Sequence, residues 1–129
     1  MPGETRPHGG LHKAMDAYRQ AATLAESALK ASPSNPTILS QLANYSAYGG
    51  DRSEPLKLLS SALALSPDDP DVLVNAAETY EFLGYHNQAI FWLRKALEHN
   101  YPRQVLERAP GFDELLKDPE IRKLTRKSK

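Results

Sequence analysis

Apolar side chains recur at helical spacing along the second half of the chain. Between Pro70 and Gly84, and again after Gly84, they lie three or four positions apart, which places them on one face of a helix. The positions are Leu73, Ala76, Ala77, Tyr80, Ala89, Leu93, Ala96 and Leu97. The pattern therefore predicts two successive amphipathic helices in this region.

The same pattern returns with a period of 34 residues. Residues of the same type coincide when the chain is shifted by this distance. Matching sets include Ala28, Ala62 and Ala96; Leu29, Leu63 and Leu97; Pro36 and Pro70; Leu39 and Leu73; Ala43 and Ala77; Gly50 and Gly84. Self-similarity at such a period is typical of helical-repeat proteins.

The ends of the expected helices carry matching signals. Asn35–Pro36 and Asp69–Pro70 each place a capping side chain before a proline at the first helical position. Gly50 and Gly84 lie where a helix must stop and reverse, and glycine accepts the left-handed conformation there. Each unit is therefore predicted to be helix, tight turn, helix, with alanines where the helices come close.

These residues resemble the tetratricopeptide repeat (TPR). The best unit is 71–101, and the unit 36–67 departs from the family pattern at Ser46 and Pro55. The signature positions are Leu73, Ala76, Ala77, Tyr80, Gly84, Ala89, Leu93 and Ala96. The resemblance implies an all-α fold, a right-handed superhelix of antiparallel helix pairs. It further implies a protein-interaction role, with the first helix of each pair lining a concave groove.

The organisation predicted along the chain has three parts. Residues 1–10, with Pro2, Pro7 and Gly9–Gly10, are expected to be disordered. Residues 11–101 hold a half repeat at 11–33 and full repeats at 36–67 and 70–101. Residues 102–129 form capping helices and a basic tail.

The C-terminal cap is expected to cover the apolar end of the repeats, because a repeat array exposes an apolar face at its end. The residues expected to do so are Val105, Leu106, Phe112, Leu115, Leu116, Ile121 and Leu124. The segment resembles the terminal cap of TPR regions in bacterial multidomain signalling proteins, several of which carry a serine/threonine kinase domain. The half repeat at the start is read either as the cut end of a longer protein or as a first capping helix.

Composition narrows the class of protein. The 129 residues include 16 basic and 16 acidic side chains, with 40% hydrophobic residues and no cysteine. This is an ordinary globular composition, without the basic excess usual in nucleic-acid binders. No signal peptide and no apolar run long enough to cross a bilayer is visible, so a cytoplasmic location is expected, with neither membrane nor nucleic acid as partner.

The chain offers no residues in a catalytic or cofactor-binding pattern. His8 and His12 have no carboxylate at a zinc-enzyme spacing, and the acids Asp68, Asp69 and Asp71 stand at a helix start, where they cap N–H groups. Neither a nucleophile elbow nor a phosphate loop occurs. The basic run from Arg122 to Lys129 has no aromatic residue to stack on bases. We therefore expect no enzyme activity, no catalytic residues, no metal and no cofactor.

The candidate partner site is the groove that the resemblance implies. Its residues are non-core positions of the two first helices. They are Thr37, Gln41, Asn44, Tyr48, Asp71, Asn75, Glu78 and Phe82. Gln41 and Asn75 occupy the same repeat position, and amides both donate and accept, so such a row could bond to a peptide backbone. Tyr48 and Phe82 are candidate apolar anchors, and the acids favour a neutral or basic ligand.

Two alternatives follow from the same residues. Asn44 and Asn75 match two asparagines with which some TPR proteins hold a C-terminal carboxylate, but Ser40 replaces an expected lysine, which argues against an acidic ligand. A missing first helix would leave the Met15/Tyr18/Ala22 side of the first predicted helix uncovered. An exposed apolar patch favours association, so a homodimer through this helix is a hypothesis, as is a spacer or regulatory role in a longer signalling protein.

Overall fold

The computed structural model describes residues 2–50, 54–109 and 111–127, and the side chains of 13–50, 54–109 and 111–124. In these ranges the chain forms eight helices and no strand, so the all-α prediction is confirmed. The helices are α1 (Pro2–Ala31), α2 (Pro36–Tyr48), α3 (Glu54–Leu65), α4 (Pro70–Leu83), α5 (His86–Glu98), α6 (Arg103–Arg108), α7 (Asp113–Leu116) and α8 (Pro119–Lys127). Among the described residues, no helix is both long enough and apolar enough to cross a bilayer. Helix α1 has 30 residues but does not meet the second condition.

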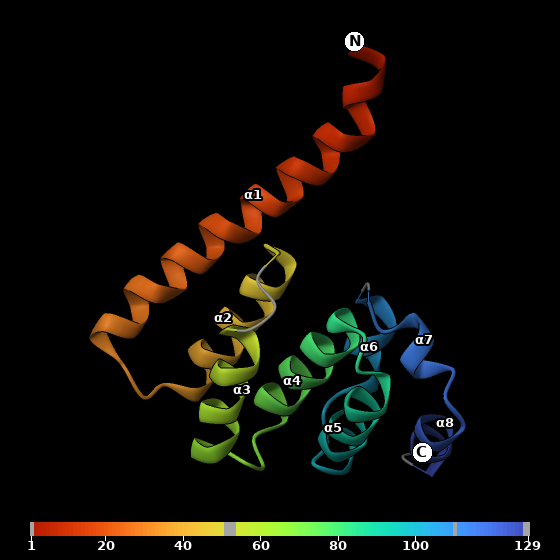
Figure 1. The fold of residues 1–129 in the computed structure, drawn as a ribbon. Helices are drawn as coiled ribbons and strands as arrows, with labels where there is room; N and C mark the ends of the chain where they lie inside the picture. Colours follow the sequence, from red (N-terminus) through yellow and green to blue (C-terminus); the bar gives the residue numbers. More distant parts are fainter. Residues whose placement is uncertain (1, 51–53, 110, 128–129) are drawn as a thin grey trace.

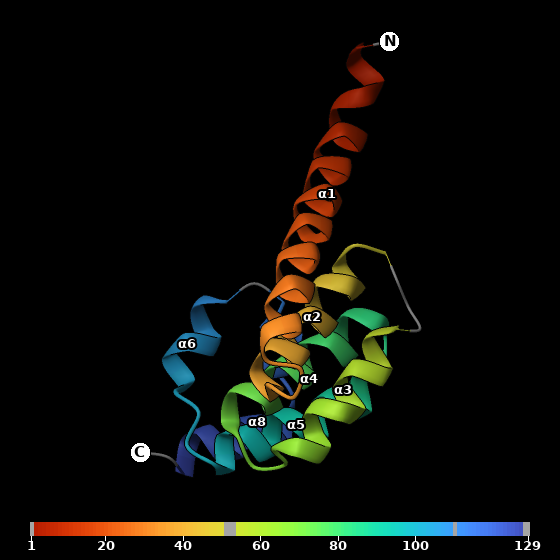
Figure 2. The same ribbon diagram turned by 90° about the vertical axis from the view of Figure 1, so that its left-hand side faces the viewer.

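The helices form adjacent pairs. Helix α2 packs against α3 and α4 packs against α5, and the two pairs meet through the contact of α2 with α4. Helix α1 lies against α2 at one end of this array, and α6, α7 and α8 lie at the other end (Figures 1 and 2). The architecture is that of a TPR-like helical repeat.

The predicted helix signals act as expected. The Asn35 side chain accepts a hydrogen bond from the Ile38 N–H at 3.1 Å, and Asp69 accepts one from the Asp71 N–H at 2.9 Å. These bonds satisfy N–H groups that the first turn leaves without partners. Gly84 adopts φ 96° directly after α4, a conformation that costs other residues about 1–2 kcal/mol.

Small side chains lie where the helices approach one another. Six alanines are fully buried: Ala43, Ala62, Ala76, Ala77, Ala89 and Ala96. Leu59, Leu73 and Leu93 are also fully buried and fill the space between the pairs. The combination of small alanines and larger leucines lets α2, α3, α4 and α5 pack closely.

The C-terminal cap extends this core. Leu106, Phe112, Leu115 and Ile121 are at most 2% exposed and join the cluster of Leu73, Leu93 and Leu97. Leu116 and Leu124 pack against the same cluster. Val105 differs from the expectation, because its side chain is 47% exposed. Neighbouring residues of a helix point about 100° apart, so when Leu106 faces the core Val105 faces solvent.

The first helix begins earlier than predicted. Its backbone is helical from Pro2, whereas residues 1–10 are expected from the sequence to be irregular. Pro2 lies in the first turn, where its missing N–H leaves no helical bond unmade. Gly9 and Gly10 lower helix stability by about 1 kcal/mol each without ending a helix. Ser53, a capping residue type just before α3, lies outside the described residues.

Helix α2 covers part of the side of α1 that the sequence left without a partner. Ala25 is buried, and the Tyr18 ring packs on Tyr48 with centroids 4.7 Å apart. The Arg19 Nε donates to the Gly49 carbonyl at 3.1 Å, at the end of α2. The Met15/Tyr18/Ala22 side is therefore only partly covered, because Met15 and Ala22 are half-buried whereas Tyr18 is 36% exposed. A homodimer through α1 remains a prediction.

Candidate functional site

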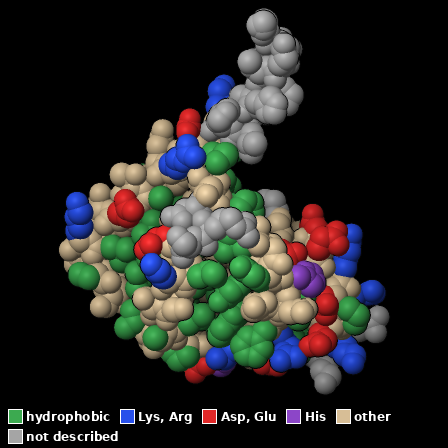
Figure 3. Space-filling model, viewed as in Figure 1, with side chains coloured by type: hydrophobic (Ala, Val, Ile, Leu, Met, Phe, Trp, Pro, Cys, Tyr) green, Lys and Arg blue, Asp and Glu red, His purple; other side chains and the backbone are tan. Residues whose placement is uncertain are grey.

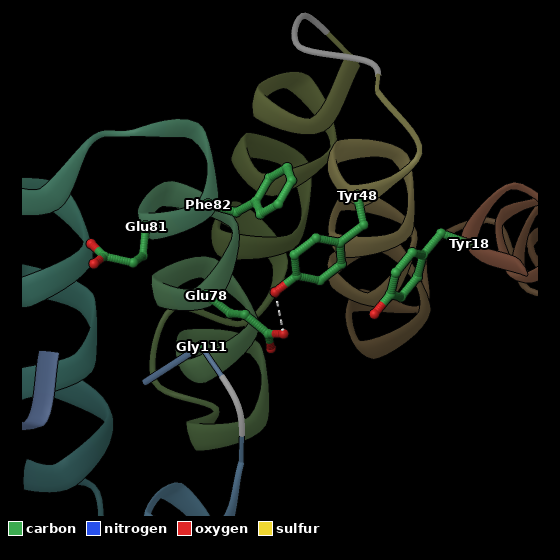
Figure 4. Close-up of a pocket in the computed structure, with 6 residues that line it drawn as sticks. All are labelled: Tyr18, Tyr48, Glu78, Glu81, Phe82 and Gly111. Atoms are coloured by element: carbon green, nitrogen blue, oxygen red, sulfur yellow. Dashed lines mark hydrogen bonds between the residues drawn. The ribbon is translucent and has the colours of Figure 1, made fainter. Parts of the chain in front are cut away.

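A pocket of about 470 Å³ opens where the C-terminal ends of α2 and α4 meet α1 (Figure 4). We call it the Tyr48 pocket. It is lined by Tyr18 from α1, Tyr48 from α2, Glu78, Glu81 and Phe82 from α4, and Gly111 from the loop before α7. Four segments far apart in the sequence thus contribute to one site.

Three aromatic rings form a row along the pocket. The Tyr48 ring stands between the other two, with its centroid 4.7 Å from that of Tyr18 and 4.4 Å from that of Phe82. The Tyr48–Phe82 pair is edge-to-face, an arrangement that aromatic quadrupoles favour. Tyr18 is 36% and Phe82 51% exposed. The row therefore presents aromatic surface to solvent while its central ring is held on both sides.

The Glu78 carboxylate lies against this row. Tyr48 Oη donates to Glu78 Oε2 at 2.6 Å (Figure 4), and Asn44 Nδ2 approaches Glu78 Oε1 at 3.3 Å. Burial raises the pKa of the Glu78 carboxyl above its ordinary value, an effect that the Tyr48 hydrogen bond opposes. Burial also raises the pKa of Tyr48, and the bond to Glu78 raises it further. Both groups are thus held in a fixed, partly desolvated pair.

The pocket wall is acidic, and no described cation is paired with its Glu78 carboxylate. Glu81 binds His86 instead, with Oε1 2.9 Å from Nδ1, and its carboxylate points away from the aromatic row in Figure 4. Arg19 is engaged with Gly49 and Asp16. Within the described residues, the Glu78 carboxylate is therefore balanced by two neutral donors, Tyr48 and Asn44.

Behind the pocket, polar side chains connect α2 to α4. Asn75 Nδ2 donates to Ser40 Oγ at 2.9 Å, and Asn44 Nδ2 donates to Asn75 Oδ1 at 3.2 Å. The Thr79 hydroxyl, which has one proton to donate, lies within hydrogen-bonding distance of two acceptors, Asn44 Oδ1 and the Asn75 carbonyl. No buried side-chain nitrogen or oxygen in the described part of the chain lacks a partner. We call these four residues the Asn44 ladder; they hold the two repeats together.

The structure separates the eight predicted groove residues into three groups. Tyr48, Glu78 and Phe82 line the pocket, and Asn44 and Asn75 belong to the ladder behind it. Thr37, Gln41 and Asp71 lie nearer the N-terminal ends of α2 and α4 and do not line the pocket. The two asparagines that resemble a carboxylate-binding pair are bonded to each other and stand beside Glu78, where an acidic ligand would be repelled.

Three lining residues were not predicted from the sequence. Tyr18 was assigned only to the apolar side of its helix, and Glu81 and Gly111 were not singled out. Helical periodicity places Glu81 next to Phe82 on α4, one turn after Glu78, which is a signal available in the sequence. The approach of Gly111, whose added Cβ would lie 3.9 Å from the Tyr48 hydroxyl, depends on how the cap folds back and has no local signal.

The remaining residues that the sequence analysis considered are the acids, the histidines and the basic tail. Within the side chains that are described, no group of three His, Cys, Asp or Glu residues comes together as a metal site. The side chains of His8 and His12, and those of Arg126, Lys127 and Lys129 in the basic tail, lie outside the described residues.

The raised pKa of Glu78 predicts a pH effect on stability. In the folded chain the carboxyl holds its proton to higher pH than in the unfolded chain. Its contribution to the free energy of unfolding is therefore present below its ordinary pKa and is lost as pH rises through the raised value. Chemical denaturation of wild type and Glu78→Gln across pH should show the difference, wild type minus variant, falling as pH rises. A difference that rises with pH would mean that the Glu78 pKa is lowered in the folded state.

The fold and the pocket together define an all-α helical-repeat protein with a solvent-open aromatic site at the junction of two repeats. Comparison with known families agrees with the fold: residues 70–100, which span α4 and α5, match the family described as Tetratricopeptide repeat. These residues are therefore similar to a tetratricopeptide repeat, a kind of unit that is typical of protein–protein interaction modules. No curated protein and no solved structure matches the chain significantly.

Proposed function

We propose that this chain is a protein-interaction module that binds an extended segment of a partner protein on the face formed by α2 and α4. The observation that carries the proposal is the row of Tyr18, Tyr48 and Phe82 along a pocket that is open to solvent. Aromatic side chains in pockets supply much of the binding energy of protein interfaces. Tyrosine combines a large contact area with a hydroxyl that fixes orientation.

The remainder of the α2/α4 face fits the same role. Gln41 and Asp71 are exposed on the first helices of the two repeats, so an amide and a carboxylate are available beyond the pocket to meet polar groups of a bound segment. The Asn44 ladder keeps this face in one arrangement, because its buried polar groups bond to one another. A preformed surface loses less entropy on binding than one that must be ordered.

The chain offers a matched pair of residues for the test. Phe82 on α4 is 51% exposed and packs edge-on against Tyr48. Phe91 on α5 is 48% exposed and packs edge-on against Trp92 with centroids 4.8 Å apart. The two phenylalanines thus have the same size, similar exposure and the same kind of neighbour. They differ in position, because Phe91 lines a separate, smaller pocket beside α5 instead of the Tyr48 pocket.

Binding peptides can be selected from a random displayed library against the full chain, and their affinity measured by calorimetry. Phe82→Ala should weaken binding by at least about tenfold, a loss typical of a central aromatic contact. Phe91→Ala should leave the affinity within about twofold. Equal losses in both variants, or a loss only in Phe91→Ala, would overturn the proposed binding face.

A spacer or regulatory role in a longer bacterial signalling protein is the alternative. Under it the chain positions another domain and has no peptide site of its own. Failure to select any saturable binder against the full chain would favour this alternative over the proposed module.

A further inference from the structure

The Tyr48 pocket combines two features that recognise the same kind of ligand. Its aromatic row presents the rings of Tyr18 and Phe82 to solvent, and ring faces attract cations through their quadrupole. The Glu78 carboxylate lies against Tyr48 at 2.6 Å and is paired with no described cation. Attraction from the rings and from the carboxylate therefore acts at one place.

The Glu78 carboxylate accepts two described hydrogen bonds and can accept further ones from a ligand. An ionised carboxylate has about four acceptor sites. Tyr48 Oη occupies one on Oε2 and Asn44 Nδ2 one on Oε1. Each bond also restrains the carboxylate, so its orientation is set before a ligand arrives. The remaining sites suit an ammonium or guanidinium group, which donates several hydrogen bonds.

Other ligands fit this pocket less well. An acidic group would meet the like charge of Glu78, whose carboxylate lies against the aromatic row. A neutral apolar group would remove water from Glu78 without replacing the lost hydrogen bonds, and burying an unpaired charge is costly. A basic group covers the rings and at the same time neutralises the carboxylate.

We propose that the Tyr48 pocket binds a basic side chain, lysine or arginine, of the partner segment. The inference deepens the proposed function and rests on it for the source of that side chain. Tyr18 and Phe82 contact the cation or its aliphatic stem, Glu78 pairs with the charge, and Tyr48 holds Glu78 in place. The partner segment is therefore expected to be basic at the position that enters the pocket.

The pocket can be tested with a single residue as probe. Nα-acetyl-arginine N-methylamide is titrated into ¹⁵N-labelled full chain and followed by NMR, with the citrulline compound as its neutral counterpart of the same shape. The arginine probe should shift the amides of Tyr18, Tyr48, Glu78 and Phe82 saturably, with a Kd on the order of 1 mM for so small a ligand. The citrulline probe should bind at least about tenfold more weakly, because it lacks the charge. The matching lysine probe shows which cation is preferred.

Two variants with the same change in net charge distinguish a direct contact with the Glu78 carboxylate from a general effect of the protein's net charge. Glu78→Gln should weaken the arginine probe by at least about tenfold. Glu98→Gln, an exposed position on α5, should change it by less than about twofold. The spectra themselves report whether Glu78→Gln remains folded. Equal binding of the arginine and citrulline probes, or equal effects of the two variants, would overturn the proposal.

The Phe82→Ala and Glu78→Gln variants test the binding face and the cation site separately. If selected peptides lose affinity in Phe82→Ala but not in Glu78→Gln, and show no basic residue in common, the binding face stands and the cation site is wrong. If the arginine probe binds at the pocket but no peptide depends on Phe82, the cation site stands and its source is not a segment lying on this face.

Discussion

Replacing Phe112 with alanine is expected to lower the free energy of unfolding by about 3–5 kcal/mol. Phe112 is 2% exposed and belongs to the same cluster as Leu73, Leu93 and Ile121. Its truncation removes a large apolar contact and leaves a cavity between the cap and the last repeat. Chemical denaturation, monitored by helical circular dichroism, measures the loss.

The control for this change lies on the same cap. Val105→Ala removes apolar atoms from a side chain that is 47% exposed, so its cost should stay below about 1 kcal/mol. Because Gly111, a wall of the Tyr48 pocket, directly precedes Phe112, the Phe112 variant should also disturb the pocket. Equal costs for the two variants would mean that the cap is not packed on the repeats.

Replacing Asn44 with alanine is expected to lower the free energy of unfolding by about 3 kcal/mol. This is the second of the two large effects. The change removes the bonds of Asn44 to Asn75, Glu78 and Thr79. Asn75 Oδ1 then has no other described partner, and a buried polar group left unpaired costs about 1–3 kcal/mol. Thr79 and Glu78 keep their bonds to the Asn75 carbonyl and to Tyr48, and the truncation of a buried side chain adds a cavity. Thermal and chemical denaturation of the purified variant give the loss.

Gln41→Ala is the matched control, because Gln41 is an exposed amide on the same helix. Its effect on the free energy of unfolding should stay within about 0.5 kcal/mol. A small loss in Asn44→Ala, similar to that of Gln41→Ala, would show that the ladder does not join the two repeats and would leave the arrangement of the pocket without its support.

The helices of the repeats could be predicted from the sequence in detail. The spacing of Leu73, Ala76, Ala77 and Tyr80 and the cap at Asp69 are local signals, and local signals determine where a helix begins and which face is buried. Two of the cap helices also begin at local signals: α6 begins directly after Pro102, and α8 begins at Pro119 after Asp118. The start of the first helix was predicted too late, because Pro7 and Gly9–Gly10 read as helix-breaking residues although they lie within α1.

The site could be predicted only in part. Tyr48, Glu78 and Phe82 were found because repeat position identifies residues of the α2/α4 face. The participation of Tyr18 could not be found, since it depends on how α1 packs across α2. The pairing of Asn44 with Asn75 was equally hidden, because periodicity distinguishes core from non-core positions but does not show which non-core side chains meet across a repeat junction.

One measurement tests most directly whether the Tyr48 pocket is the partner site. Intermolecular NOEs can be recorded between a selected, unlabelled peptide and ¹³C-labelled aromatic rings of the full chain. The account predicts NOEs from a lysine or arginine side chain of the peptide to the rings of Tyr18, Tyr48 and Phe82. NOEs to Phe91 and Trp92 on α5 instead, with none to the Tyr48 pocket, would contradict it.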